Sequence, residues 1–171
     1  MLTPWTLQHA AWPAPVRQGQ WVFVTENPVV TAAACGHDGA RHARLLCTVG
    51  TPSAQELDAL ARLAALGWRI AARADFDAAG LAHVRAVLCA VPGATAWRMS
   101  AADYLRSLHP APYRPAHLEA GQLPATGWDP ALAQAMRARA RPAYEEALLE
   151  ELCADLHTGH PPPRPGHAPG G

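Results

Sequence analysis

Short apolar runs alternate along the chain with longer stretches in which apolar residues recur every three or four positions. The short runs predict buried strands, and the three-to-four spacing predicts amphipathic helices. Residues 21–25 are the clearest strand, because β-branched and aromatic residues fit a pleated sheet well. We expect further strands at residues 44–48, 68–73 and 95–99, with a weaker candidate at residues 6–9.

Capping residues mark where the helices begin and end. Ser53 and Glu56 form the capping-box pattern of a helix start, and Gly67 is a typical helix stop. A second capped start lies at Ser100 with Asp103. The expected helices are residues 28–34, 53–67, 78–90, 100–108, 129–140 and 144–157.

The alternation of strands and helices predicts the fold class. It favours an α/β fold with a mostly parallel, Rossmann-like sheet, flanking helices and additional C-terminal helices. We expect one domain over residues 1–157, with a lead-in segment at 1–20 and the C-terminal helices at 129–157. The Pro- and Gly-rich residues 158–171 are expected to be a disordered tail. The abrupt opening suggests that an upstream part is missing.

Composition and charge give no sign of a membrane, secreted or strongly basic nucleic-acid-binding protein. The chain has 14 basic residues, all Arg, and 14 acidic residues, so its net charge gives no global signal for nucleic acid or membrane. The overall charge does not exclude a basic patch on one face of the protein. The start does not resemble a signal peptide, and no apolar run is long enough to span a membrane. Four scattered cysteines without a Cys-x-x-Cys pair indicate a cytoplasmic protein with reduced thiols.

Acidic residues follow two of the expected strands. Glu26 follows the first strong strand, and Asp75 and Asp77 lie where the third hands over to a helix. Right-handed crossovers bring the carboxyl ends of parallel strands to one edge, where α/β proteins bind ligands. Gly80 would let the first turn of that helix approach a neighbouring backbone closely.

Acids gathered at one edge need a cation or must stay apart. Two bare carboxylates about 4 Å apart repel by about 4 kcal/mol at an effective dielectric constant near 20. Oxygen ligands without Cys or His select a hard ion, so Mg²⁺ (or Mn²⁺) is the expected cofactor and phosphoryl chemistry the expected reaction. The simpler alternative is that Asp77 caps the helix and Asp75 is a solvated strand end.

Other residue groups have weaker interpretations. An Asp-x-Asp phosphatase of the haloacid-dehalogenase type would place its motif on the first strand, and a Rossmann nucleotide site would need a Gly-rich loop that residues 26–28 do not provide. His83 is expected to pack or to face solvent, and the tyrosines to be packing or loop residues (Tyr104, Tyr113, Tyr144). A zinc site would use Cys35, His37, His42 and Cys47, whose spacing fits no common knuckle. A solvated helical face is expected for Glu145, Glu146, Glu150 and Glu151.

Four blocks of sequence, in this order, resemble a known family. They are residues 22–28 (Val-Phe-Val-Thr-Glu-Asn-Pro), 47–53 (Cys-Thr-Val-Gly-Thr-Pro-Ser), 75–81 (Asp-Phe-Asp-Ala-Ala-Gly-Leu) and 97–105 (Trp-Arg-Met-Ser-Ala-Ala-Asp-Tyr-Leu). The pattern resembles the Toprim fold of topoisomerases, primases and several nucleases. It is most similar to the Toprim-like C-terminal domain of the JetD subunit of bacterial Wadjet plasmid-defence systems, which is related to topoisomerase VI A subunits. The resemblance covers roughly residues 5–157.

The resemblance implies a Mg²⁺-dependent DNA endonuclease. Glu26, Asp75 and Asp77 would be both the catalytic residues and the metal ligands, and water would attack the phosphate. DNA and a condensin-like SMC complex would be the partners, with a homodimer expected by analogy alone. The family's large amino-terminal region is not represented in this chain, which leaves autonomous activity open. Candidates for positioning the substrate are Asn27, Thr48, Gly50, Thr51, Gly80, Arg98 and Asp103.

An alternative interpretation has the same fold but no catalytic activity. The chain would then be a non-catalytic Toprim module that binds DNA or an SMC-complex partner. Cleavage of DNA in the presence of Mg²⁺ would distinguish the two functions.

Overall fold

Four parallel strands form the centre of the computed structural model, which describes residues 9, 11–38, 43–108, 118 and 123–163. Their order across the sheet is β2-β1-β3-β4. The expected α/β fold with a parallel sheet and flanking helices is confirmed, and the arrangement is consistent with a Rossmann-like Toprim fold. The strands are β1 (Trp21–Thr25), β2 (Leu45–Cys47), β3 (Arg69–Ala72) and β4 (Thr95–Ala96).

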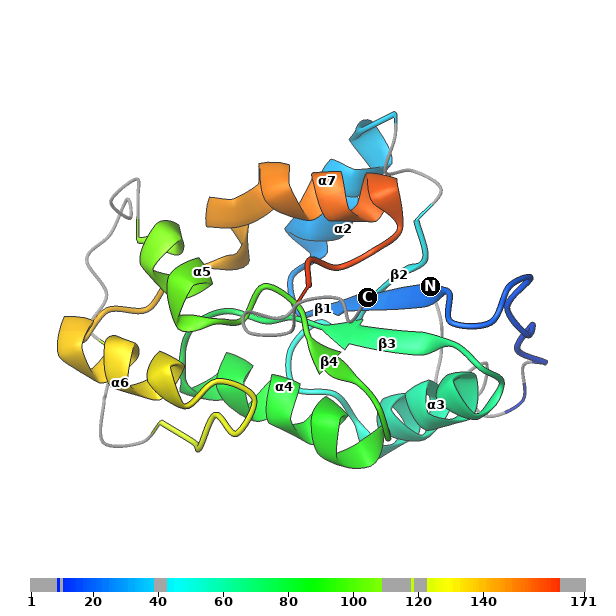
Figure 1. Ribbon diagram of the computed structural model, residues 1–171, viewed down its shortest axis with the longest axis horizontal. Coiled ribbons are helices and arrows are strands. Elements are labelled where there is room, and N and C mark those ends of the chain that lie inside the picture. Colours follow the sequence, from blue (N-terminus) through cyan, green and yellow to red (C-terminus); the bar gives the residue numbers. More distant parts are fainter. Residues whose placement is uncertain (1–8, 10, 39–42, 109–117, 119–122, 164–171) are drawn as a thin grey trace, which may run out of the picture.

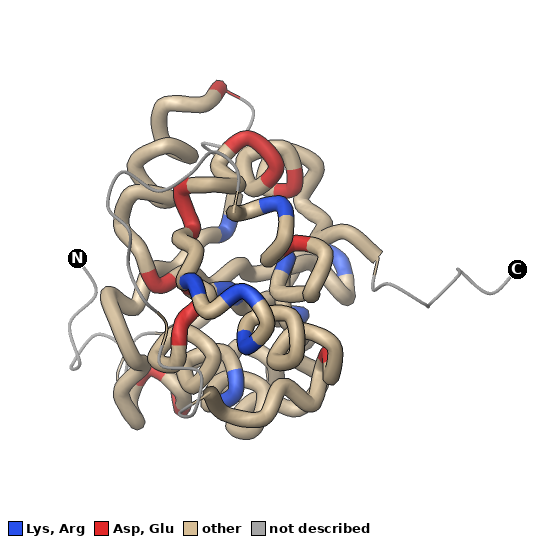
Figure 2. Tube along the Cα trace, turned by 90° about the vertical axis from the view of Figure 1, so that its left-hand side faces the viewer, with Lys and Arg blue, Asp and Glu red and all other residues tan. Residues whose placement is uncertain are grey.

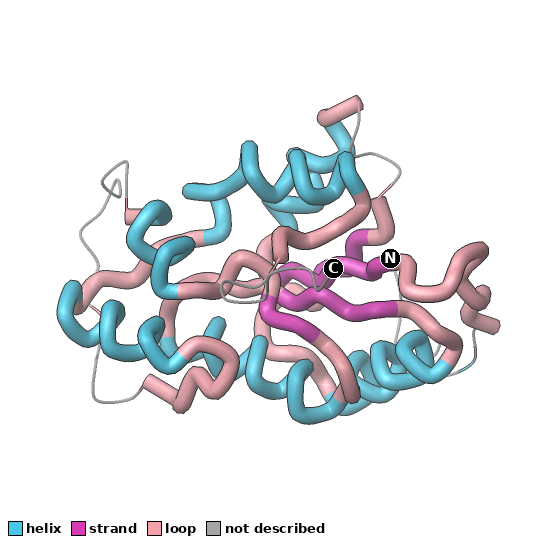
Figure 3. Tube along the Cα trace, viewed as in Figure 1, coloured by secondary structure: helices cyan, strands magenta, loops and turns pink. Residues whose placement is uncertain are grey.

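Helices cover both faces of this sheet and extend beyond its carboxyl edge (Figures 1 and 3). In Figure 1, α2 and α7 lie above the strands, α3 and α4 lie below them, and α5 and α6 lie at the left. The helical segments are α2 (Pro28–Gly36), α3 (Ala54–Ala65), α4 (Ala78–Ala90), α5 (Ala101–Ser107), α6 (Pro130–Arg139), the 3₁₀ segment η2 (Glu145–Leu148) and α7 (Leu149–Thr158).

The alternation of side chains along β1 divides the core. Trp21 and Phe23 pack with α2 and α7 on one face, and Val22 and Val24 pack with α3 and α4 on the other. Such alternation follows from the two-residue period of a strand. A third apolar cluster lies beyond the carboxyl edge and joins α4, α5 and α6. It anchors the segments that surround the acids described below.

Local signals placed most element ends correctly. Both capping boxes are present, at Ser53 and at Ser100, and Gly67 follows α3 with a φ of +102°. The strands β2 and β3 are one residue shorter at each end than expected. The last strand ends at Ala96 instead of residue 99, because the chain turns at Arg98, whose φ is +47°.

The C-terminal part differs from the expectation of one helix over residues 144–157. A 3₁₀ turn precedes α7, since the chain ahead of it is held by an antiparallel bridge between Ala143 and Phe76. The α7 helix includes Thr158, which the prediction assigned to the tail, and residues 159–163 are also described. Residues 164–171 and residues 6–8 of the weak strand candidate lie outside the described residues, and His9 is helical. None of the helices in the described part combines the length and apolar content needed to cross a bilayer.

Candidate acidic site at the carboxyl edge of the sheet

The structure brings Glu26, Asp75 and Asp77 to one edge of the sheet. Glu26 directly follows β1, the aspartates follow β3, and these two strands are parallel neighbours. The Glu26 carboxylate accepts a hydrogen bond from the backbone of Asp75 and lies within electrostatic reach of Asp77. All three side chains are partly buried.

Each aspartate also has a structural contact. Asp77 is the N-cap of α4, where its Oδ1 accepts a hydrogen bond from the Gly80 amide at 2.7 Å. The capping alternative is therefore correct for Asp77. Asp75 is not a solvated strand end, because it is partly buried and its Oδ1 accepts a hydrogen bond from the Glu145 amide at 2.7 Å. Among the described residues, no hydrogen bond is found to the second oxygen of either carboxylate.

Gly80 makes the close approach that its position predicted. A Cβ atom there would lie 2.1 Å from the carbonyl oxygen of Asp75. No side chain fits at that distance, so the glycine allows the first turn of α4 to seat directly on the segment that carries both aspartates.

Burial and mutual repulsion perturb these acids. Burial raises the pKa of Asp75 to about 6, and the negative charges of Glu26, Glu146 and Asp77 add to this effect, while the hydrogen bond from Glu145 opposes it. Burial also raises the pKa of Glu26, with Asp77 contributing in the same direction. The Oε2 atom of Glu26 is buried and has no hydrogen-bond partner within the described part of the chain. The site therefore favours an added positive charge.

Glu145 is a site residue that the sequence pattern misplaced. The expectation of a solvated face holds for Glu146 and Glu150, which are exposed, but Glu145 is fully buried. Its Oε1 lies 3.5 Å from Nε of Arg73, and neither side chain is exposed to solvent. Burial raises the pKa of Glu145 to about 8, although the attraction of Arg73 opposes this shift.

The segment around Glu145 joins the ends of β1 and β3. Glu145 Oε2 accepts a hydrogen bond from the Asn27 amide at 2.7 Å, and the Glu145 amide donates to Asp75. Asn27 caps α2 with its Oδ1 and donates from its Nδ2 to Glu146 Oε1 at 2.8 Å. The backbone bridge between Phe76 and Ala143 completes the attachment. The sequence signal that could have indicated such a partner is Arg73, since an arginine ending a buried strand needs an acid nearby.

In the loop after β2, the contacts of Thr48 and His83 are made to backbone carbonyl groups. Thr48 Oγ1 donates to the Gly50 carbonyl at 3.0 Å, with a longer contact of 3.4 Å to the Thr25 carbonyl. The buried side chain of His83 lies 3.1 Å, through Nδ1, from the same Gly50 carbonyl, so this histidine packs inside instead of facing solvent. Thr51 is exposed. Thr48 thus supports the loop and does not point its hydroxyl proton at the acids.

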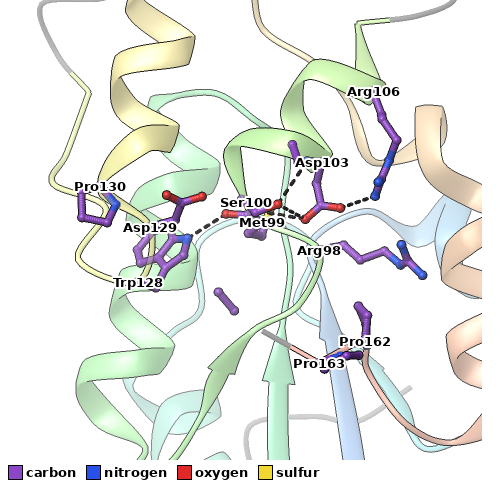
Figure 4. A pocket seen from close by; sticks show the side chains of 12 residues that line it. Arg98, Met99, Ser100, Asp103, Arg106, Trp128, Asp129, Pro130, Pro162 and Pro163 are labelled. Carbon is purple, nitrogen blue, oxygen red and sulfur yellow. Dashed lines mark hydrogen bonds and ion pairs between the residues drawn. The ribbon is translucent and has the colours of Figure 1, made fainter. Parts of the chain in front are cut away.

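Arg98 and Asp103 do not pair with each other. Arg98 makes a two-pronged contact with Asp155, at 2.6 Å from Nε and 2.8 Å from Nη2. Asp103 instead caps α5 and contacts Arg106. Each of these charges has another partner in the structure, so their assignment to substrate positioning stays a prediction. Both residues line a cavity of about 490 Å³ between β4, α5 and α6 (Figure 4). Trp128 lies on its opposite side.

The tyrosines take structural positions where they are described. Tyr104 is buried in the core beyond the carboxyl edge, and its hydroxyl donates to the Arg141 carbonyl at 2.7 Å. Tyr144 is exposed at the start of η2. Tyr113 lies outside the described residues, as does His42 of the zinc alternative.

No group of three or more His, Cys, Asp or Glu side chains within the described ranges is arranged to hold a metal ion. The zinc alternative therefore has no support there, and Glu26, Asp75 and Asp77 are not drawn together closely enough to hold one ion as a set of three. Mg²⁺ differs from zinc in needing only one or two carboxylates, with water and phosphate as its other ligands. The buried, unpartnered oxygen of Glu26 and the all-oxygen donor set of Asp75 and Asp77 fit such an ion chemically.

Comparison with known proteins gives the family. No curated protein and no solved structure matches the chain significantly. One family profile matches residues 1–156, which is most of the 171 residues. The chain belongs to the family described as "Protein of unknown function C-terminus (DUF2399)".

Proposed function

We propose that this chain is a Toprim-type, Mg²⁺-dependent DNA endonuclease domain, as in the JetD subunit of Wadjet plasmid-defence systems, whose partner is a condensin-like SMC complex. One observation carries the proposal. Three acids gather at the carboxyl edge, with a buried oxygen of Glu26 unpartnered among the described residues and the pKa of Asp75 raised to about 6. Such crowding without a cation costs stability, and a function that uses the cation explains it.

The free carboxylate oxygens suggest how the site would work. One or two of the carboxylates of Glu26, Asp75 and Asp77 would hold Mg²⁺ or Mn²⁺, with water and phosphate completing its ligands. The ion, when bound, would polarise a phosphodiester and stabilise its displacement by water. Glu145 fixes Asp75 through its amide, and Gly80 fixes Asp77. These contacts orient the two aspartates before substrate arrives, which lowers the cost of assembling the site.

A second candidate is the non-catalytic module that binds DNA or an SMC-complex partner. It is favoured by one observation: Asp75 and Asp77 each use one oxygen to hold a backbone amide, which is a structural role that needs no metal. On this interpretation the acids would be retained for the fold alone.

Nicking of supercoiled plasmid in Mg²⁺ or Mn²⁺ tests the proposal. Asp75→Asn keeps an oxygen for the Glu145 amide but loses the charge, so we expect cleavage to fall by at least about 10²-fold with the fold intact. Asp58→Asn is the matched control, because Asp58 is an exposed acid on α3. Cleavage that survives Asp75→Asn would reject the metal site. Metal-dependent retention of DNA without any cleavage by the unaltered chain would favour the binding module.

A further inference from the structure

Three arginines lie at alternate positions at the end of α6, 137, 139 and 141, and we call them the α6 arginine cluster. Arg137 and Arg139 are exposed and Arg141 is half-buried. No acidic residue occurs between Pro130 and Tyr144. The ion pairs found within the described residues engage Arg62, Arg73, Arg98 and Arg106, but none of this cluster. The cluster is therefore a local positive region on a chain of zero net charge.

The chain leads from this cluster directly into the acidic site. Ala140 ends α6 with a φ of +48°, and the Arg141 carbonyl accepts a hydrogen bond from Tyr104 at 2.7 Å. Two residues later Ala143 bridges to Phe76, which stands between the two aspartates in sequence. Viewed from the side on which α6 lies, the trace shows both basic and acidic positions (Figure 2). The positive region is thus joined to the acid-bearing segment by a short run of chain, and the charges of Arg139 and Arg141 act on Tyr104, whose ring packs on Phe76.

Helix stabilisation explains only part of this cluster. Cations in the last turn of a helix gain about 0.3–1 kcal/mol each from the helix dipole. That accounts for Arg137 and Arg139, which lie in the last turn of α6. It does not account for Arg141, which lies beyond the end of the helix and has its backbone fixed by Tyr104.

We propose that the α6 arginine cluster binds the backbone phosphates of double-stranded DNA beside the acidic site. The choice of DNA among polyanions rests on the proposed function. The crowded acids repel an approaching phosphate backbone, and three guanidinium groups without an ion pair among the described residues, on the segment that leads to the acids, supply the opposing attraction. Arginine suits this role because its planar fork of donors matches phosphate oxygens. The contacts hold the duplex in position and read no sequence.

The test measures binding of a fluorescently labelled DNA duplex by anisotropy, with EDTA present so that no cleavage occurs. The variant replaces all three arginines of the cluster by Gln. The matched control replaces three exposed arginines outside the carboxyl edge: Arg17→Gln, Arg44→Gln and Arg85→Gln. The control removes the same total charge. It therefore distinguishes the loss of a specific binding site from the effect of a lower net charge. Circular dichroism verifies folding, and a double variant at positions 137 and 139 alone keeps the half-buried Arg141.

We expect the cluster variant to bind at least about tenfold more weakly, and the slope of log affinity against log salt to fall by about 2–3, since each lost phosphate contact contributes about 0.9. The double variant should lose roughly two-thirds of that slope. Equal losses in the control, an unchanged salt slope, or binding to single-stranded RNA but not to duplex DNA would each overturn the proposal. Cluster-dependent binding by a chain that never cleaves DNA would support this inference and count against the nuclease.

Discussion

Gly80 sits where the backbone of α4 meets the carbonyl of Asp75, and the contact leaves no room for a methyl group. Gly80→Ala is expected to destabilise the fold by about 1–3 kcal/mol, because either α4 or the aspartate segment must shift. Urea denaturation measures this loss. Gly36→Ala at the end of α2 is the control, since a Cβ atom there would contact nothing within 4 Å. Equal stability of the two variants would contradict the packing argument.

The buried pair of Arg73 and Glu145 gives a second residue-scale prediction. Glu145→Ala leaves the guanidinium buried without its acid, so above pH 8, where Glu145 is ionised, we expect a loss of about 3–5 kcal/mol in the free energy of unfolding. Removing both charges together, with Arg73→Met and Glu145→Leu, should restore at least about half of that loss, because no uncompensated charge remains. Denaturant titration of both variants checks this. A double variant as unstable as Glu145→Ala alone would show that the charge pair is not the cause.

At the scale of elements, Asp77 both begins α4 and faces the other acids. These two roles separate by substitution. Asp77→Asn keeps a capping oxygen, so stability should change by no more than about 0.5 kcal/mol, whereas Asp77→Ala should lose about 0.5–2 kcal/mol. If Asp77 also serves the proposed metal, both variants lose plasmid nicking. Thermal denaturation and nicking measured together test this; full nicking by Asp77→Asn would restrict the residue to capping.

The 3₁₀ segment η2 is the element that closes the site. Its first residue, Glu145, contacts Asn27 and Asp75 at the ends of β1 and β3. Ala143, just before it, bridges to Phe76, and the segment departs from regular α-helix where these contacts hold it. Most helix starts are set by capping residues nearby in the sequence. The start of this C-terminal helical segment is set instead by contacts with residues far away in the sequence. This is why the pattern of apolar residues predicted the helix and missed its first turn.

At the scale of the whole molecule, the acids make stability depend on pH. The pKa values of Asp75 and Glu145 rise in the folded state, to about 6 and about 8, so the folded chain holds protons that the unfolded chain releases. Their contribution is fully present below pH 4 or so and is lost as the pH rises toward 8. We expect the free energy of unfolding to fall by about 2 kcal/mol or more across this window.

Mg²⁺ should reverse this loss if it binds the acids. A cation competes with protons for the same carboxylates, so added Mg²⁺ is expected to raise the melting temperature at pH 8 and to have little effect at pH 5. Thermal denaturation at both pH values, with Asp58→Asn as a control that should respond like the unaltered chain, checks the effect. The same shift in Asp75→Asn would place the ion elsewhere.

The sequence by itself determined the features that arise from neighbouring residues. The strand at 21–25, the helix at 78–90, both capping boxes and the close approach at Gly80 follow from side-chain shape and backbone bonding within a few positions. The alternation of elements also fixed the parallel sheet, and with it the edge shared by Glu26, Asp75 and Asp77. Chain connectivity was sufficient for these inferences.

Only the tertiary structure decided which charges become partners. Arg73 meets Glu145, and Arg98 meets Asp155 instead of Asp103, across long separations in sequence. Distance and burial in the folded chain determine which charged residues pair. The sequence alone does not distinguish among the acids of a helix with a polar pattern, because only tertiary packing removes water from one of them. The acidic edge could be predicted because strand ends coincide. The buried pair that supports it could not, because its geometry depends on how the last helices dock.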